Sequence, residues 1–103
     1  MKNALELIAD ERQRQIDVYG YSDDHILKSV EDYSCGELGD AAASYAMTQG
    51  FRDDSSEGHK TPFFFPWDED YFNPSPGDRI KELVKAGAMI VAEITRLQND
   101  PID

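Results

Sequence analysis

The sequence predicts an all-α fold, a compact three- or four-helix bundle in which residues 1–103 form a single helical domain. Apolar residues recur at helical spacing in three segments, and no segment shows convincing strand alternation. Hydrophobic residues make up 40% of the chain and aromatic residues 11%, which is typical of globular proteins. A long aromatic and proline-rich loop is expected before the last helix.

The first helix is predicted over residues 3–18, with Gly20 as its stop signal. Arg12 falls in the same stripe as its apolar residues, which are Leu5, Ile8, Ala9, Ile16 and Tyr19. Residues 20–33 are polar and predict a loop or a short helical turn.

A second helix is predicted from about Cys35 to Gln49, because Ser34 and Glu37 have the spacing of a capping box and Gly50 suits a C-terminal cap. Its small residues would let another helix approach closely. Its inner face is expected to consist of Leu38, Ala41, Ala42 and Tyr45. Residues 51–61 have loop composition.

Six aromatic residues fall between Phe63 and Phe72, with prolines at both ends of the segment 61–74. Proline blocks a regular helix there, so we expect an ordered loop that folds back over the bundle. The third helix is predicted to open with Ser75 as cap and to end near Asn99 and Pro101. Its apolar stripe consists of Ile80, Leu83, Val84, Gly87, Val91, Ile94 and Leu97.

The net charge of the chain limits the classes of partner that it can bind. A net charge of −11 argues against non-specific binding to nucleic acid and against binding to anionic membranes.

The single cysteine, Cys35, allows no disulfide within one chain, and no apolar leader or membrane span is evident, so a cytoplasmic protein is expected. A chain of this size has a modest core, which favours a homo-oligomer.

Cations beside apolar stripes indicate a pocket for a small anionic ligand. Arg12, Arg79 and Lys85 would contact phosphate groups, and the start of the last helix favours an anion near Arg79. Gln15 and Tyr45 are expected to line the same pocket. The alternative is that these cations form salt bridges with Glu11, Glu37 or Glu82.

The aromatic segment could supply a stacking surface for a purine ring. Trp67 and Tyr71 are the best candidates, because each carries a polar group on its ring. For most of the other rings, a small core beneath a long loop or a dimer contact is the favoured interpretation.

Carboxylates offer a different chemistry. Glu37 and Asp40 lie three residues apart on one helix face, and with Glu11 or Glu6 they could hold Mg²⁺, which prefers oxygen ligands. Such an ion could position a water molecule for hydrolysis of a pyrophosphate bond. The alternative is that Glu37 serves only the capping box.

The Glu37-Leu38-Gly39-Asp40 run followed by alanines resembles the acidic helix of the all-α, MazG-like nucleoside triphosphate pyrophosphohydrolases. The resemblance implies Mg²⁺-dependent cleavage of nucleoside triphosphates to monophosphates. The first motif of those enzymes is a Glu-x-x-Glu pair on a preceding helix. The nearest candidates here, Glu6, Asp10 and Glu11, do not have that spacing.

Most of the chain resembles a family of small, uncharacterised phage proteins. The residues that carry the resemblance are Glu11 to Gln15, Gly20-Tyr21, Gly36-Glu37-Leu38, the tryptophan-containing loop, Arg79 and Leu83 to Ala88. The family implies no settled activity. It implies a phage setting, and hence the cytoplasm of an infected bacterium, where small phage proteins often act on nucleotide pools or block host defence.

Three functions remain open. The favoured one is a binder without turnover, or sponge, for a nucleotide-like ligand such as an immune signalling nucleotide of the cyclic dinucleotide or cyclic ADP-ribose type, with no catalytic residue and no cofactor. The second is the Mg²⁺-dependent pyrophosphohydrolase. The third is an acidic protein that blocks a basic host surface.

Overall fold

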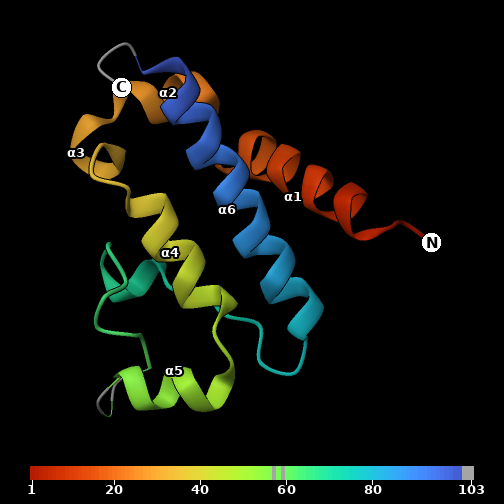
Figure 1. Cartoon of the computed structure of the whole chain (residues 1–103), viewed down its shortest axis with the longest axis vertical. Helices are drawn as coiled ribbons and strands as arrows, with labels where there is room; N and C mark the ends of the chain where they lie inside the picture. The colour runs from red at the N-terminus through yellow and green to blue at the C-terminus, as the bar shows by residue number, and fades with distance from the viewer. Residues whose placement is uncertain (57, 59, 101–103) are drawn as a thin grey trace.

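The chain folds into an all-α structure in which one long helix is packed by shorter ones (Figure 1). This computed structural model describes residues 1–56, 58 and 60–100, and no strand occurs within those ranges. Helix α6 runs diagonally through the molecule beside α4, and α1 crosses it. The elements in chain order are α1 (Ala4–Tyr19), α2 (Asp23–Lys28), α3 (Val30–Tyr33), α4 (Glu37–Ala46), α5 (Gln49–Ser56), the 3₁₀ turn η1 (Glu69–Tyr71) and α6 (Arg79–Asn99).

Both ends of α1 are capped, the C-terminal end by the predicted Gly20. At its start, the Asn3 side chain accepts from the Glu6 N–H at 2.9 Å, and the Glu6 carboxylate accepts from the Asn3 N–H at 3.1 Å. At its end, Gly20 adopts φ 76° and donates to the carbonyl of Ile16. The predicted helix over 3–18 is therefore confirmed, whereas the segment expected to be mainly loop contains two helices, α2 and α3.

The start of α4 differs from the prediction. Ser34 is not its cap, because Ser34 ends α3 by donating its N–H to Val30. The chain then turns through Gly36, whose φ is 84°, and α4 begins at Glu37. The Glu37 carboxylate accepts from the Cys35 N–H at 2.7 Å, so the predicted Ser34–Glu37 capping box does not form.

Helix α5 occupies part of the segment predicted to be a loop. Residues Gln49–Ser56 are helical, and Gly50 lies within this helix instead of capping the preceding one. The local composition gives no helix signal here. The helix is held by Arg52, whose side chain is 1% exposed and anchored by groups outside α5.

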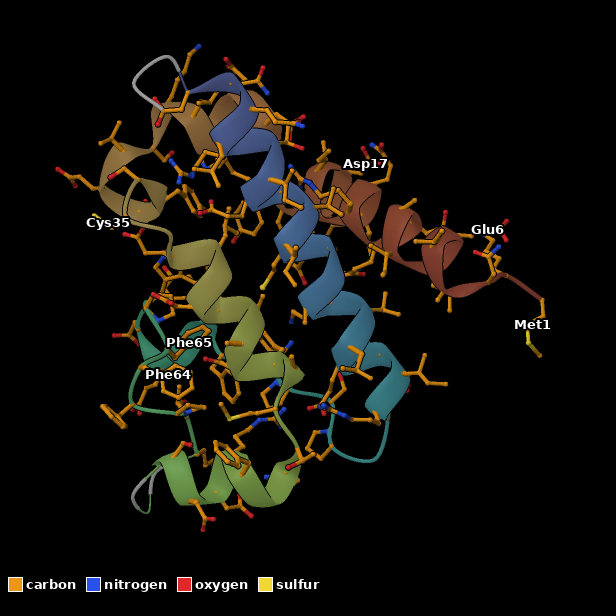
Figure 2. All side chains as sticks on the ribbon, in the orientation of Figure 1. Met1, Glu6, Asp17, Cys35, Phe64 and Phe65 are labelled. Atoms are coloured by element: carbon orange, nitrogen blue, oxygen red, sulfur yellow. The ribbon has the colours of Figure 1, made fainter. Side chains whose placement is uncertain are left out.

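The aromatic segment folds back over the bundle, as predicted, with one short 3₁₀ turn inside it. Phe65 and Phe72 are buried against Tyr45 of α4 and form a core cluster with Ala41, Ala42 and Ala86. A second cluster contains Ile26, Tyr33, Leu38 and Ala92, and Trp67 and Met89 pack against both clusters. Figure 2 shows Phe65 beside α4, whereas Glu6 lies on α1 at the opposite side of the molecule.

Helix α6 starts later than predicted and presents an unexpected face to the core. Its cap is Asp78, not Ser75, and the Asp78 side chain accepts from the Lys81 N–H at 3.1 Å. The helix ends at Asn99, and Pro101 lies outside the described residues. Its buried apolar residues are the small Ala86, Ala88 and Ala92, which allow close packing, while the stripe of large apolar residues points away from the core. No helix in the described ranges has both the length and the apolar character needed to cross a membrane.

Candidate functional site

A half-open cleft of about 720 Å³ lies where α1, α2, α4, α6 and the aromatic segment meet. Its volume falls in the range of roughly 300–1,000 Å³ that small-molecule sites occupy. Five residues of the sequence-predicted ligand site line it: Gln15, Tyr45, Trp67, Tyr71 and Lys85. Arg12 and Arg79 do not.

One wall of the cleft is built from a continuous row of rings. Consecutive centroids lie between 4.9 and 6.2 Å apart, within the range of favourable aromatic contacts. The row runs through Tyr19, Tyr21, His25, Tyr33, Trp67, Phe65, Phe72 and Tyr45. All of these except Phe65 line the cleft, so a flat ligand would meet ring faces and edges over much of its surface.

Lys85 places a cation inside this aromatic cleft. Its ammonium lies 4.6 Å from the centre of the Tyr45 ring and donates one hydrogen bond, of 3.2 Å, to the carbonyl of Asn73. Within the described part of the chain it has no ion-pair partner, although an ammonium has three donors. Burial lowers the pKa of Lys85, and the nearby Glu11 carboxylate partly opposes this effect.

Glu11 and Arg14 form the polar edge of the cleft on α1. The Arg14 guanidinium donates two hydrogen bonds to the Glu11 carboxylate, at 2.7 and 2.9 Å, and this contact raises the pKa of Arg14. Gln15 is buried, and its amide lies 3.5 Å from the same carboxylate. Arg14 and Glu11 therefore neutralise each other, and among the described residues that line the cleft this leaves the Lys85 ammonium available to a ligand.

The tyrosines of the wall are held by burial and by backbone contacts. The Tyr45 hydroxyl accepts from the Asn73 N–H at 2.9 Å and donates to the carbonyl of Tyr71 at 3.4 Å. Burial raises the pKa of Tyr45, and it raises the pKa of Tyr33 to about 12. Both phenols thus stay neutral at physiological pH. Trp67 is fixed by its indole N–H, which donates to the carbonyl of Asp32 at 3.0 Å.

The rim of the cleft is acidic. Asp32, Asp68 and Asp70 contribute to its lining, and all three are exposed. These carboxylates repel a ligand with several negative charges, but they are solvated and screened by salt. The cleft therefore suits a ring-bearing ligand with few negative charges better than it suits a triphosphate.

Arg12 joins two helices instead of facing the cleft. It is 8% exposed, and its guanidinium donates to the carbonyl of Tyr21 at 2.8 Å and to the Asp23 carboxylate at 2.9 Å. These contacts attach α1 to the start of α2. The expectation that Arg12, Arg79 and Lys85 share a pocket is not met by this geometry, because the guanidinium of Arg12 is occupied by internal acceptors.

The Arg79 guanidinium also lies outside the cleft and binds backbone carbonyls. Its guanidinium donates to the carbonyls of Tyr45 and Met47, at 3.1 and 2.9 Å, and to the carbonyl of Ala46. These groups are the free carbonyls at the C-terminal end of α4, where a cation is favourable. Arg79 also lies 3.5 Å from the Glu82 carboxylate. This salt bridge is the alternative to phosphate binding that the sequence left open for Arg79.

The candidate metal ligands do not converge. Glu11 faces the cleft, while Glu37 bonds the backbone N–H of Cys35 at the start of α4, and Asp40 is exposed one turn later. No three His, Cys, Asp or Glu side chains in the described part of the chain are grouped closely enough to bind one ion. The described geometry therefore gives Mg²⁺ no assembled set of protein ligands.

Sequence reasoning missed several residues that shape the site. Tyr21, His25 and Tyr33 belong to the ring row, and Arg52, which pairs with Glu82, fixes the end of α4 next to Tyr45. The available signal was the presence of these aromatic residues in segment 20–33, which the sequence predicted to be a loop or a short helical turn. Arg52 gave none, because it stands among exposed, loop-like neighbours in the sequence.

Fold and cleft together define a small all-α protein with an aromatic-walled cleft that contains Lys85, which has no ion-pair partner among the described residues. Comparisons with protein-family models, with curated proteins and with solved structures gave no match to this chain.

Proposed function

We propose that this protein binds a nucleotide-like small molecule in the aromatic cleft and does not turn it over. The ring of the ligand would stack on the wall that contains Tyr45 and Trp67, and an anionic group would contact the ammonium of Lys85. Base stacking on aromatic side chains is worth about 1–3 kcal/mol per base. A cation that is not already paired adds a charge-assisted hydrogen bond.

The observation that carries the proposal is the position of Lys85. An ammonium that loses water without gaining a carboxylate partner is unfavourable in the free protein. A ligand anion would relieve that cost. In the described part of the chain, Arg12, Arg52 and Arg79 donate to protein carbonyls or carboxylates, and so they have fewer free donors for a ligand.

The acidic rim of the cleft favours a ligand with few, well-separated negative charges, because its carboxylates repel a highly charged anion. A cyclic dinucleotide or a cyclic ADP-ribose derivative fits this description better than a nucleoside triphosphate. Together with the phage setting implied by the sequence resemblance, this preference supports a sponge that sequesters an immune signalling nucleotide.

The test is a binding panel measured by calorimetry. Cyclic dinucleotides, cyclic ADP-ribose, AMP and ATP with Mg²⁺ are each titrated into the protein, and each mixture is then heated and analysed by chromatography. We expect binding of a cyclic nucleotide, weaker binding of ATP, and recovery of the bound molecule intact. Release of monophosphate from ATP would support the pyrophosphohydrolase instead.

Two lysine variants give the matched control. Lys85→Met removes the ammonium from the cleft and should weaken binding at least tenfold, the equivalent of about 1.4 kcal/mol. Lys81→Met removes an exposed ammonium one turn earlier on the same helix and should leave binding unchanged. Binding of no ligand in the panel, or equal affinity in the wild type and Lys85→Met, would contradict the proposal.

A further inference from the structure

Helix α6 exposes its large apolar residues and buries charged ones, which is the reverse of what is expected for a central helix. Its large apolar residues face outward: Ile80, Leu83, Ile90, Val91, Ile94 and Leu97 are 41–68% exposed. Its charged residues Glu82 and Arg96 are 6% and 7% exposed and face the rest of the chain. Figure 1 shows α6 crossing in front of α1, with α4 alongside.

The outward face carries no charge. At 3.6 residues per turn, the α6 positions within roughly 60° of Gly87 are Ile80, Leu83, Val84, Gly87, Ile90, Val91, Ile94 and Gln98. Lys85, Glu93 and Arg96 lie on the other side of the helix. In a chain with a net charge of −11, an uncharged face along the full length of its longest helix indicates a surface that becomes covered.

Helix α1 extends this face. Gly87 leaves a gap in the row, and Ile8 of α1 fills it, since a Cβ at Gly87 would lie 2.7 Å from the Ile8 Cδ1. Leu5 lies one turn before Ile8 on the same side of α1 and is 79% exposed. The apolar surface is thus continuous from Leu5 across the middle of α6.

We propose that this apolar surface is the interface of a homodimer, in which the exposed apolar side chains of α6 and Leu5 of α1 pack against the same surface of a second copy. The α6 residues do not form an uninterrupted two-helix seam, because Ile8 of α1 already contacts Gly87 in the middle of the row. On either side of this crossing Ile80, Leu83, Ile90 and Ile94 remain exposed, so they are accessible to a partner.

Charge and exposed apolar surface also favour a second copy. Two chains of equal negative charge can meet on this face without bringing carboxylates together, because it holds none. A membrane-binding helix would carry lysine and arginine beside its apolar face, and the net charge of this chain opposes an anionic surface. The six exposed apolar side chains of α6 and Leu5 of α1 form one patch, and large exposed apolar patches mark protein–protein interfaces.

The interface is tested by measuring molecular mass with light scattering after size-exclusion chromatography. We expect the wild type to have twice the mass of the chain and Ile94→Glu to have the mass of one chain, with unchanged helix content by circular dichroism. The matched control is Val30→Glu, which places the same charge at an apolar position on α3 that is 60% exposed, and it should remain a dimer.

Three results would overturn the proposal. They are a monomeric wild type, a dimer that survives the double variant Leu83→Glu/Ile94→Glu, and a dimer that Val30→Glu disrupts equally. None of them depends on ligand binding, since Lys85 and the cleft lie on the other side of α6, so this proposal can fail while the proposed function stands.

Discussion

At the residue scale, Arg52 stabilises the end of α4 next to the candidate site. Its guanidinium donates to the carbonyls of Ser44 and Tyr45, at 3.2 Å each, and to the Glu82 carboxylate at 3.0 Å. The last carbonyls of a helix have no partner within the helix, so a buried guanidinium there replaces the water that they lose. The same contacts fix the backbone that carries the Tyr45 ring.

Removal of this guanidinium should therefore be costly. Arg52→Ala leaves the buried Glu82 carboxylate with Arg79 and the Ser75 N–H as its partners among the described residues, and it should lower the free energy of unfolding by about 3 kcal/mol or more. The comparison is Lys28→Ala, which breaks the Lys28–Asp24 pair, whose side chains are 76% and 74% exposed, and should cost less than about 1 kcal/mol. Urea unfolding measures both values, and equal effects would contradict this role of Arg52.

The lowered pKa of Lys85 gives ligand binding a pH dependence. An anion binds the protonated ammonium, so affinity should fall as the pH rises through a pKa that burial holds below the ordinary 10.5. The fall should begin at a lower pH than an exposed lysine would give. Calorimetry from pH 7 upward measures it, and Lys85→Met should lose this part of the pH dependence. A wild-type affinity that stays constant up to pH 10.5 would show that Lys85 does not contact the anion.

At the element scale, α4 begins at Glu37 because Gly36 adopts a left-handed backbone conformation. An alanine Cβ there would lie 3.7 Å from the Glu93 carboxylate, an ordinary contact, so any cost comes from the backbone. Gly39 lies within the helix, and a Cβ there would meet no atom within 4 Å. The two glycines thus form a matched pair.

Gly36→Ala should destabilise the protein by about 1 kcal/mol, because alanine is disfavoured in the left-handed region. Gly39→Ala should stabilise it by roughly 0.5–1 kcal/mol, because alanine suits a helix better than glycine. Thermal and urea unfolding of both variants give the two signs. If both substitutions had the same sign, the described start of α4 would be incorrect.

At the scale of the whole molecule, two chains that each carry a net charge of −11 repel each other even when their contact face is neutral. Salt shortens the range of that repulsion, from a Debye length of about 10 Å at 0.1 M to about 3 Å at 1 M. The proposed dimer should therefore tighten as salt is added, which sedimentation equilibrium measures. An interface held by ion pairs would weaken instead, and that result would contradict an apolar interface.

The sequence alone determined the all-α class, the extent of α1 and the return of the aromatic segment over the bundle. Each depends on signals within a few residues: helical periodicity, a glycine stop, and prolines around a run of rings. The uncharged row on α6 is equally visible in the sequence, because periodicity along one helix is a local property.

Only the tertiary structure decided which face of α6 is buried and what each cation contacts. Arg79 bonds the carbonyl of Tyr45, 34 residues away, and Arg52 pairs with Glu82, 30 residues away. Such contacts depend on which helix ends meet in space, and no local pattern encodes that. Helix α5 has the same origin, since Arg52 is held mainly by distant groups, which are the carbonyls at the end of α4, Glu82 of α6 and the Phe72 ring, in addition to Gln49 of its own helix. The cleft therefore contains one of the three predicted cations, because the carbonyls of folded helix ends and a carboxylate on α2 compete for the other two.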